Sequence, residues 1–203
     1  MTIAKKKAAI FLAMLLISLF LIGLVQPYAS AEETSDTSTP AMIQGLDAYI
    51  STGVGGTFAL DEESAQADGY SQEAINMVKH QLSIMNELSN SENSVVDPAT
   101  LTVTVYQIST RARGINKYVV HWNGLTERWM DSDNANAYIQ GLETGGNVSK
   151  FVPGWVGSMT KLYSASSIAQ AKQAAKPGRG IIMFTQYSTT GTTTIPTVWY
   201  GAQ

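Results

Sequence analysis

The chain has 203 residues, thirteen of them basic and sixteen acidic, a net charge of −3 and no cysteine. Without cysteine it has no disulfide, no thiolate metal site and no thiol nucleophile, so packing must hold the fold. The acidic balance disfavours nucleic acid as a partner, because binding to phosphates needs clustered Lys and Arg.

The first thirty-one residues are typical of a secretory signal. Three lysines at 5–7 precede an apolar run over 8–25, and the Ala-Ser-Ala triplet at 29–31 has the pattern of a cleavage site. The run is at the lower edge of membrane-spanning length, so an uncleaved anchor is the alternative. Pro27 breaks the helix close to the run and argues against that alternative. Cleavage after Ala31 predicts a secreted protein with ten basic against sixteen acidic residues, a net charge of −6.

A polar arm follows the signal. Residues 32–41 begin Glu-Glu-Thr-Ser-Asp-Thr-Ser-Thr-Pro and offer no apolar side chain before residue 41 to anchor them. Such a composition does not compensate for the entropy lost on ordering, and we expect disorder there. Residues 42–203 then form the folded part, and nothing in them indicates a second domain or a repeat.

The first part of the folded region predicts a β element and two helices. Apolar residues on both sides of glycines 53–56 predict either a short hairpin or a strand with a loose loop. Acidic residues at its start and Gly69 at its end predict a short helix over 61–69. Ser71 then caps a long helix over 72–89, whose apolar residues recur at spacings of three and four.

Strands dominate the next stretch. From Leu101 the apolar residues alternate with threonines, as a strand with one buried face requires. A second strand over 118–122 meets Asn123-Gly124, the strongest local signal for a hairpin, and predicts pairing with 125–130 through a type I′ turn.

The last part predicts two helices and a terminal hairpin. Asp131 caps a helix that Gly145-Gly146 ends, and a second helix is expected over 155–176, between two Pro-Gly pairs. Residues 180–187 and 194–200 are β-branched and aromatic, and predict paired strands. Helices and strands in blocks favour an α+β fold: one antiparallel sheet packed by three to four helices in a single domain.

Residues able to carry catalysis are few. We expect His80 to be a solvated residue of a helix. His121 ends a predicted strand, and the sequence contains no G-x-S-x-G motif that would supply a serine nucleophile for it. Glu127, Asp131 and Asp133 are close in sequence, but a glycosidase needs two carboxylates facing each other across a cleft, and solvated side chains are the simpler reading. The acidic run from Asp131 departs from a calcium loop and fits a helix cap better, so we expect no metal and no cofactor.

The aromatic residues are the more informative set. Tryptophan combines a large apolar area with a polar N–H group, so it serves cores, carbohydrate platforms and membrane interfaces alike. Core packing is the default for each of them. The candidate binding surface consists of Trp122, Trp129, Trp155 and Trp199.

Several short sequence features occur together in this chain. They are the G-T-F-A-L-D run at 56–61, A-D-G-Y-S at 67–71, W-N-G at 122–124, the helix over 134–142 and G-R-G-I-I at 178–182. In these it resembles a loosely defined group of small exported proteins of Gram-positive bacteria with no assigned activity. Some members are bacteriocin-like and strongly apolar where this chain has 153–175, a segment that here is amphipathic. The resemblance implies a location outside the cell rather than a mechanism.

Three classes of function follow as expectations. The first is a secreted, non-enzymatic protein that binds at or near the bacterial cell surface, to cell wall or membrane. The second is an antimicrobial or toxin-like protein that acts on membranes through the 155–176 helix. The third is an extracellular hydrolase that uses His121 or the carboxylates between Glu127 and Asp133.

Cleavage of the signal can be tested directly. We expect the secreted protein to begin at Glu32, because the signal peptidase pattern ends at Ala31. N-terminal sequencing of protein from culture medium measures this, and secreted material that begins at Met1 would contradict it.

Overall fold

The computed structural model describes residues 39–107, 112–152, 162–190 and 193–203, without the side chains of 188–195. The predicted signal, most of the predicted polar arm and Trp155 lie outside these ranges. Everything that follows concerns the unit formed by the described part of residues 38–203.

The described residues form two antiparallel sheets, a hairpin and a six-stranded sheet in which each strand pairs with its neighbour in sequence. The hairpin strands are β1 (Ile50–Thr52) and β2 (Phe58–Leu60). The sheet strands, in spatial order, are β3 (Ser94–Asp97), β4 (Thr102–Gln107), β5 (Asn116–His121), β6 (Leu125–Asp131), β7 (Gly180–Thr190) and β8 (Thr193–Ala202).

In the described ranges, four α-helices and three short 3₁₀ segments accompany the sheets. The α-helices are α2 (Glu62–Ala67), α3 (Gln72–Ser89), α4 (Ser132–Thr144) and α5 (Ala165–Ala175). The 3₁₀ segments are η1 (Ala41–Ile43), η2 (Leu46–Tyr49) and η3 (Ser149–Phe151). This α+β arrangement with an antiparallel sheet confirms the fold class expected from the sequence.

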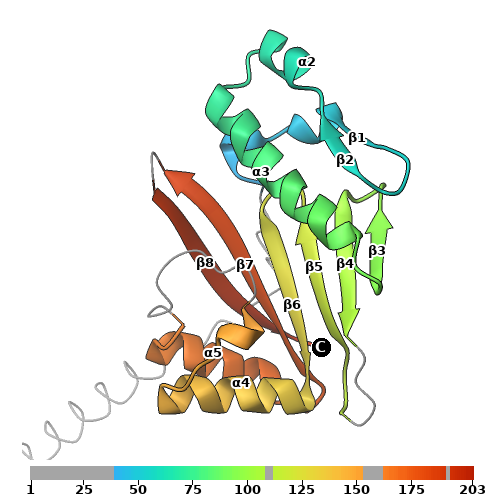
Figure 1. Cartoon of the computed structure of the whole chain (residues 1–203). Helices are drawn as coiled ribbons and strands as arrows, with labels where there is room; N and C mark the ends of the chain where they lie inside the picture. The colour runs from blue at the N-terminus through green and yellow to red at the C-terminus, as the bar shows by residue number, and fades with distance from the viewer. Residues whose placement is uncertain (1–38, 108–111, 153–161, 191–192) are drawn as a thin grey trace, which may run out of the picture. The chain divides into compact units, whose positions relative to one another are not determined.

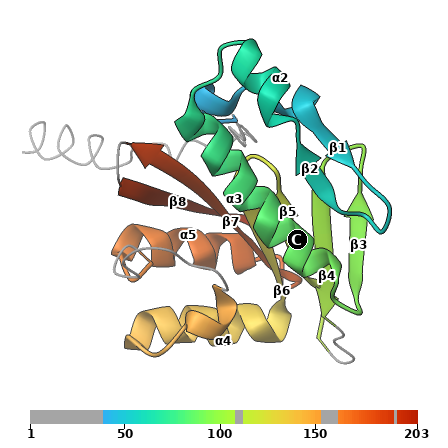
Figure 2. The same cartoon turned by 45° about the horizontal axis from the view of Figure 1, so that its top comes forward.

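The three longer helices pack on one face of the six-stranded sheet, in two groups. α3 contacts β3, β4 and β5, whereas α4 and α5 contact the strands from β6 to β8 (Figures 1 and 2). Residues at alternate positions of a strand share a face of the sheet. Tyr118, which packs on the α3 core, pairs with Arg128 on β6. Met130, which belongs to the core of α4 and α5, is two residues after Arg128 and so lies on the same face. Both groups therefore lie on the same side of the sheet, which we call the helix face.

Each helix group has its own hydrophobic core. One core joins α3 and the β1–β2 hairpin to β4 and β5. It contains Val78 and Met85 of α3, Val103 of β4 and Val120 of β5. The other joins α4 and α5 to β6 and β7 and contains Tyr138, Leu142, Ala171, Met130 and Ile181.

Local signals set the helix starts. The side chain of Ser71 accepts a hydrogen bond from the backbone N–H of Ala74, and that of Asp131 accepts one from Asn134 at 2.9 Å. These are the bonds that cap a helix, because the first backbone N–H groups have no partner within it. Both predicted caps are confirmed, as are the short hairpin, the terminal hairpin and the short helix after Asp61.

The β5–β6 hairpin is confirmed, but its predicted type I′ turn is wrong. Val120 pairs with Thr126, so three residues, Trp122 to Gly124, connect the strands. Gly124 has φ +82°, whereas Asn123 does not have positive φ, which a type I′ turn would require. A hydrogen bond from Gly124 N–H to the His121 carbonyl closes a turn that Gly124 then leaves in the left-handed region. This is the three-residue loop that commonly replaces the two-residue one.

The predicted helix over 155–176 is shorter than expected. In the described part of this segment α5 begins at Ala165, with Ser164 as its cap, and residues 162–164 precede it as a turn. The apolar pattern at Leu162 and Tyr163 has another cause, since Leu162 is buried in the core and the Tyr163 hydroxyl donates to the Gly146 carbonyl. Among the helices of the described ranges, none has the length and apolar character to cross a membrane.

The glycine in the β5–β6 loop offers a test of this geometry. We expect Gly124→Val to cost about 1 kcal/mol or more, because a β-branched residue is strained at φ +82°. At this size that lowers the melting temperature by roughly 2 to 4 °C or more. Gly124→Asn is the control and should melt closer to the wild type, since asparagine tolerates this conformation. A valine variant that melts with the wild type would contradict the geometry.

Candidate functional site

The side of the sheet opposite the helix face carries the polar and aromatic residues of interest, and we call it the back face. It is formed by alternate residues of the central strands, whose cross-strand pairing places them side by side. Its residues include Lys117, Val119, His121, Leu125, Glu127, Trp129, Ile182, Phe184 and Trp199. Neither hydrophobic core includes any of them.

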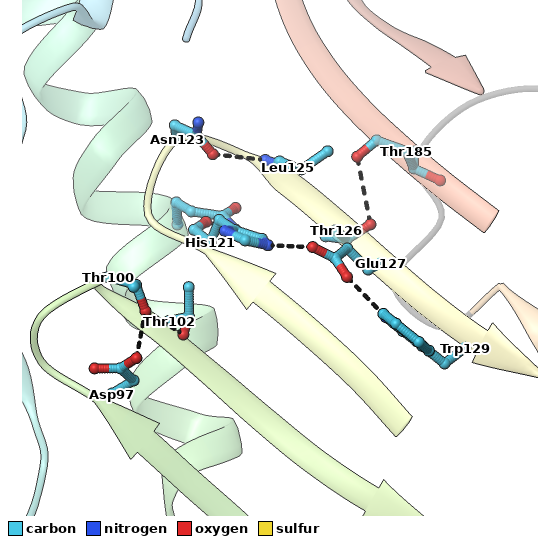
Figure 3. Close-up of polar contacts among 11 residues, drawn as sticks. Asp97, Thr100, Thr102, His121, Asn123, Leu125, Thr126, Glu127, Trp129 and Thr185 are labelled. Carbon is cyan, nitrogen blue, oxygen red and sulfur yellow. Dashed lines mark hydrogen bonds and ion pairs between the residues drawn. The ribbon is translucent and has the colours of Figure 1, made fainter. Parts of the chain in front are cut away.

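His121 and Glu127 form the central contact of the back face (Figure 3). His121 Nε2 lies 2.9 Å from Glu127 Oε1, and the indole N–H of Trp129 donates to Glu127 Oε2 at 2.7 Å. Glu127 and Trp129 are two residues apart on β6, and His121 is a diagonal neighbour on β5, so the sheet itself brings the three together. The carboxylate thus holds both an imidazole and an indole in fixed orientations.

Glu127 keeps its negative charge in this setting. Burial raises its pKa, but the hydrogen bonds from His121 and Trp129 and the charges of His121 and Lys117 outweigh burial, so the pKa lies below the ordinary 4.5. The side chains of His121 and Glu127 are only 23% and 18% exposed, which limits screening of the pair by solvent. Glu127 is therefore a carboxylate at neutral pH.

Among the described residues, the histidine–carboxylate pair has no nearby hydroxyl that would complete a hydrolytic triad. Thr102 is the cross-strand partner of His121, but its hydroxyl contacts that of Thr100 at 3.0 Å, and Thr100 in turn bonds to Asp97 (Figure 3). Within the described ranges no Ser or Thr hydroxyl is bonded to His121. What the described contacts show is that Glu127 orients the His121 ring and the Trp129 indole.

The other carboxylates weighed for catalysis have different positions. Asp131 is buried, caps α4 and bonds to Asn116, while Asp133 is exposed in the first turn of that helix. The described residues contain no group of His, Asp and Glu side chains placed to hold a metal ion.

A pocket of about 650 Å³ adjoins Trp129. The residues that line it are Arg113, Gly114, Ile115, Trp129, Pro177, Arg179 and Gln203. The Nζ atom of Lys117 lies 4.0 Å from the centre of the Trp129 ring, so a third cation stands beside the pocket. Both arginines are exposed, and neither makes an ion pair with a carboxylate of the described residues.

Close backbone contact brings the two arginines together. A Cβ atom on Gly114 would lie 1.9 Å from the carbonyl oxygen of Arg179, and Gly114 has φ +102°, so only glycine fits. The side-chain amide of Gln203 accepts from the N–H of Ile115 at 2.7 Å and donates to the Met130 carbonyl at 2.8 Å. The wall of the pocket is therefore built from segments far apart in the sequence.

Of the four tryptophans named as a possible binding surface, Trp122 lies on the other face of the sheet from Trp129 and Trp199. Trp122 packs against the α3 core on the helix face, and Trp155 lies outside the described residues. Trp129 and Trp199 share the back face. Trp199 stacks on its cross-strand partner Phe184 with ring centres 5.4 Å apart and planes inclined by 8°.

The cations around Trp129 were missed by the sequence reasoning. The only local signal for either residue is an adjacent glycine, and an Arg-Gly dipeptide is common in ordinary loops, so it does not indicate a binding site. The other histidine, His80, is exposed on α3, in keeping with its sequence-based interpretation.

Comparison with known proteins found no matching family model, no similar curated protein and no similar solved structure.

The charge on Glu127 predicts a pH dependence. Because its folded pKa is below its ordinary value, the stability it contributes is present above pH 4.5 and is lost as pH falls through the folded pKa. At pH 7 we expect Glu127→Gln to lower the free energy of unfolding by roughly 1 to 3 kcal/mol. Denaturant unfolding should show that this difference shrinks below about pH 4.

The matched control for this measurement is Glu87→Gln, which removes an exposed carboxylate of α3. It should change stability little at either pH. A Glu127 variant that is as stable as the wild type at pH 7 would show that the carboxylate does not hold the cluster.

Proposed function

We propose that this protein is an exported, non-enzymatic binding protein that takes an anionic group of the bacterial cell wall into the pocket beside Trp129. The supporting observation is the pair Arg113 and Arg179, two exposed cations without carboxylate partners among the described residues, in a pocket lined by a tryptophan. Guanidinium groups bind carboxylates and phosphates through paired hydrogen bonds, which makes such an anion the natural ligand.

The shape of the ligand follows from the rest of the pocket. Trp129 and Ile115 provide apolar area next to the two cations, and Ile115 is 50% exposed. Glu127 and Lys117 hold the indole ring from two sides, so the ring is already in place before a ligand binds. Such preorganisation lowers the entropic cost of binding. An acidic sugar unit, with a ring to place on Trp129 and a charge to place between the arginines, matches this set.

The net negative charge of the chain does not oppose this binding mode. At physiological ionic strength charges are screened over about 8 Å, so a ligand within the pocket senses the nearby cations more than the distant carboxylates. The same screening distinguishes a pocket for one anionic group from a surface for a polyanion such as nucleic acid, which needs a long basic stripe.

The packing of α5 argues for this class over a membrane-active one. Ala171 and Ala174 are buried against the sheet, and Lys172 on its outer side forms an ion pair with Glu143 of α4. The apolar side of the helix is thus already covered by the protein, whereas an interfacial helix presents that side to lipid.

Cosedimentation with isolated cell walls of a Gram-positive bacterium tests the proposal. We expect the mature protein to bind intact walls, and walls stripped of phosphate-bearing polymers and acidic sugars by acid extraction to bind at least tenfold more weakly. Replacing both pocket arginines, Arg113→Gln with Arg179→Gln, should weaken binding to intact walls by a similar factor.

The matched control replaces two other exposed cations, Lys79→Gln with Lys172→Gln, which changes net charge equally. It should bind walls as the wild type does. Equal binding by the arginine variant and the wild type would overturn the pocket assignment, and binding to phosphatidylglycerol vesicles in place of walls would favour the membrane class.

A further inference from the structure

A buried arginine lies on the helix face, between the two hydrophobic cores. Arg128 of β6 is 7% exposed and has Tyr118 of β5 and Met183 of β7 as its cross-strand partners. Tyr118 packs on the α3 core and Met183 belongs to the core of α4 and α5. Threonines 126 and 185 lie beside it on the same face, so a polar band separates the two cores.

Among the residues with described positions, the guanidinium group of Arg128 bonds to a neutral amide and to no carboxylate. Its Nη2 donates to Gln107 Oε1 at 2.8 Å, while the buried Nε has no hydrogen-bond partner. None of the ion pairs formed by the described residues involves Arg128. Burial lowers the pKa of Arg128, yet a guanidinium keeps its proton in proteins, so the charge persists.

A buried charge without a counter-ion is unfavourable for the folded state, because the lost hydration is not replaced by an opposite charge. An apolar side chain of similar length between Tyr118 and Met183 would join the two cores without this penalty. A costly residue in such a position is expected where it serves recognition.

Gln107 marks where an anion would reach the guanidinium. It is the last residue of β4 and is exposed, and its amide oxygen accepts the hydrogen bond that a carboxylate oxygen would accept more strongly. We propose that Arg128 recognises the oxyanion group, a carboxylate or a phosphate, of a small ligand that displaces the side chain of Gln107.

This site is separate from the pocket beside Trp129. Residues 128 and 129 are consecutive on β6 and point to opposite faces of the sheet, so a ligand on one does not contact the other. The inference therefore does not rest on the proposed binding to cell walls.

The test measures melting temperatures of the mature protein in chloride, acetate and phosphate at matched pH and ionic strength. At ten times its dissociation constant, a bound oxyanion should raise the melting temperature by about 3 to 6 °C relative to chloride. Acetate and phosphate distinguish the two ligand chemistries. Phosphate also stabilises proteins by exclusion from their surface, so each shift is compared with that of a variant without the guanidinium.

Two variants separate recognition from a structural role. Arg128→Met should melt higher than the wild type in chloride, because it removes the uncompensated charge, and should lose the specific response to oxyanions. Gln107→Glu supplies a carboxylate from the protein itself, and should likewise raise the melting temperature in chloride and abolish the response. Lys79→Gln, which removes an exposed cation of α3 outside both sites, is the control and should keep the full response.

The outcomes that overturn the proposal are distinct. An equal oxyanion shift in the wild type and Arg128→Met would show that the shift arises elsewhere, from a general salt effect or from the pocket beside Trp129. If Arg128→Met fails to fold, the Gln107→Glu variant serves instead. A Gln107→Glu protein that retains the whole response to oxyanions would then refute the proposed site. Absence of any shift with acetate or phosphate would equally refute the proposal, whatever the arginine variants of the other pocket show.

Discussion

Lys117 and Trp129 are cross-strand partners on β5 and β6, and so are their neighbours Tyr118 and Arg128. Because successive side chains of a strand point to opposite faces, one pair faces away from the helices and the other faces toward them. The remaining architecture depends on this register. A slip of one residue would place Lys117 under the helices and remove Tyr118 from the α3 core.

The helix face is divided because each helix of the described residues covers only part of the sheet. α3 covers the strands on one side and α4 with α5 cover those on the other, and each group buries its own apolar cluster. The central strand β6 lies at this division, with Met130 in the core of α4 and α5 and Arg128 beside it in the polar band. A chain without disulfides thus holds its sheet from both ends by packing alone.

The cations of the described residues have three different environments. Arg113 and Arg179 are exposed and adjacent to an indole ring, whereas Arg128 is buried and bonded to an amide. Other cations, such as Lys79 and Lys172, form ion pairs with glutamates on the helix surfaces, and these pairs do not indicate a ligand site. The distinction between these groups is one of neighbours and burial, and the amino-acid type alone does not reveal it.

The residue sequence by itself determined the elements whose causes are local. Ser71 and Asp131 cap helices through bonds to residues three positions away, and Asn123-Gly124 marks a hairpin because Gly124 adopts a conformation that other residues avoid. Some details of these elements still depended on tertiary contacts. The type of turn depended on which residues of β5 and β6 paired, and the start of α5 depended on the packing of Leu162 in the core. The candidate sites were decided only by tertiary structure. Arg113 and Arg179 line one pocket because Gly114 lies close to the backbone of Arg179, and Trp129 contacts Lys117 because β5 and β6 pair. The burial of Arg128 results from the docking of helices on either side of it, an interaction that no short stretch of sequence encodes.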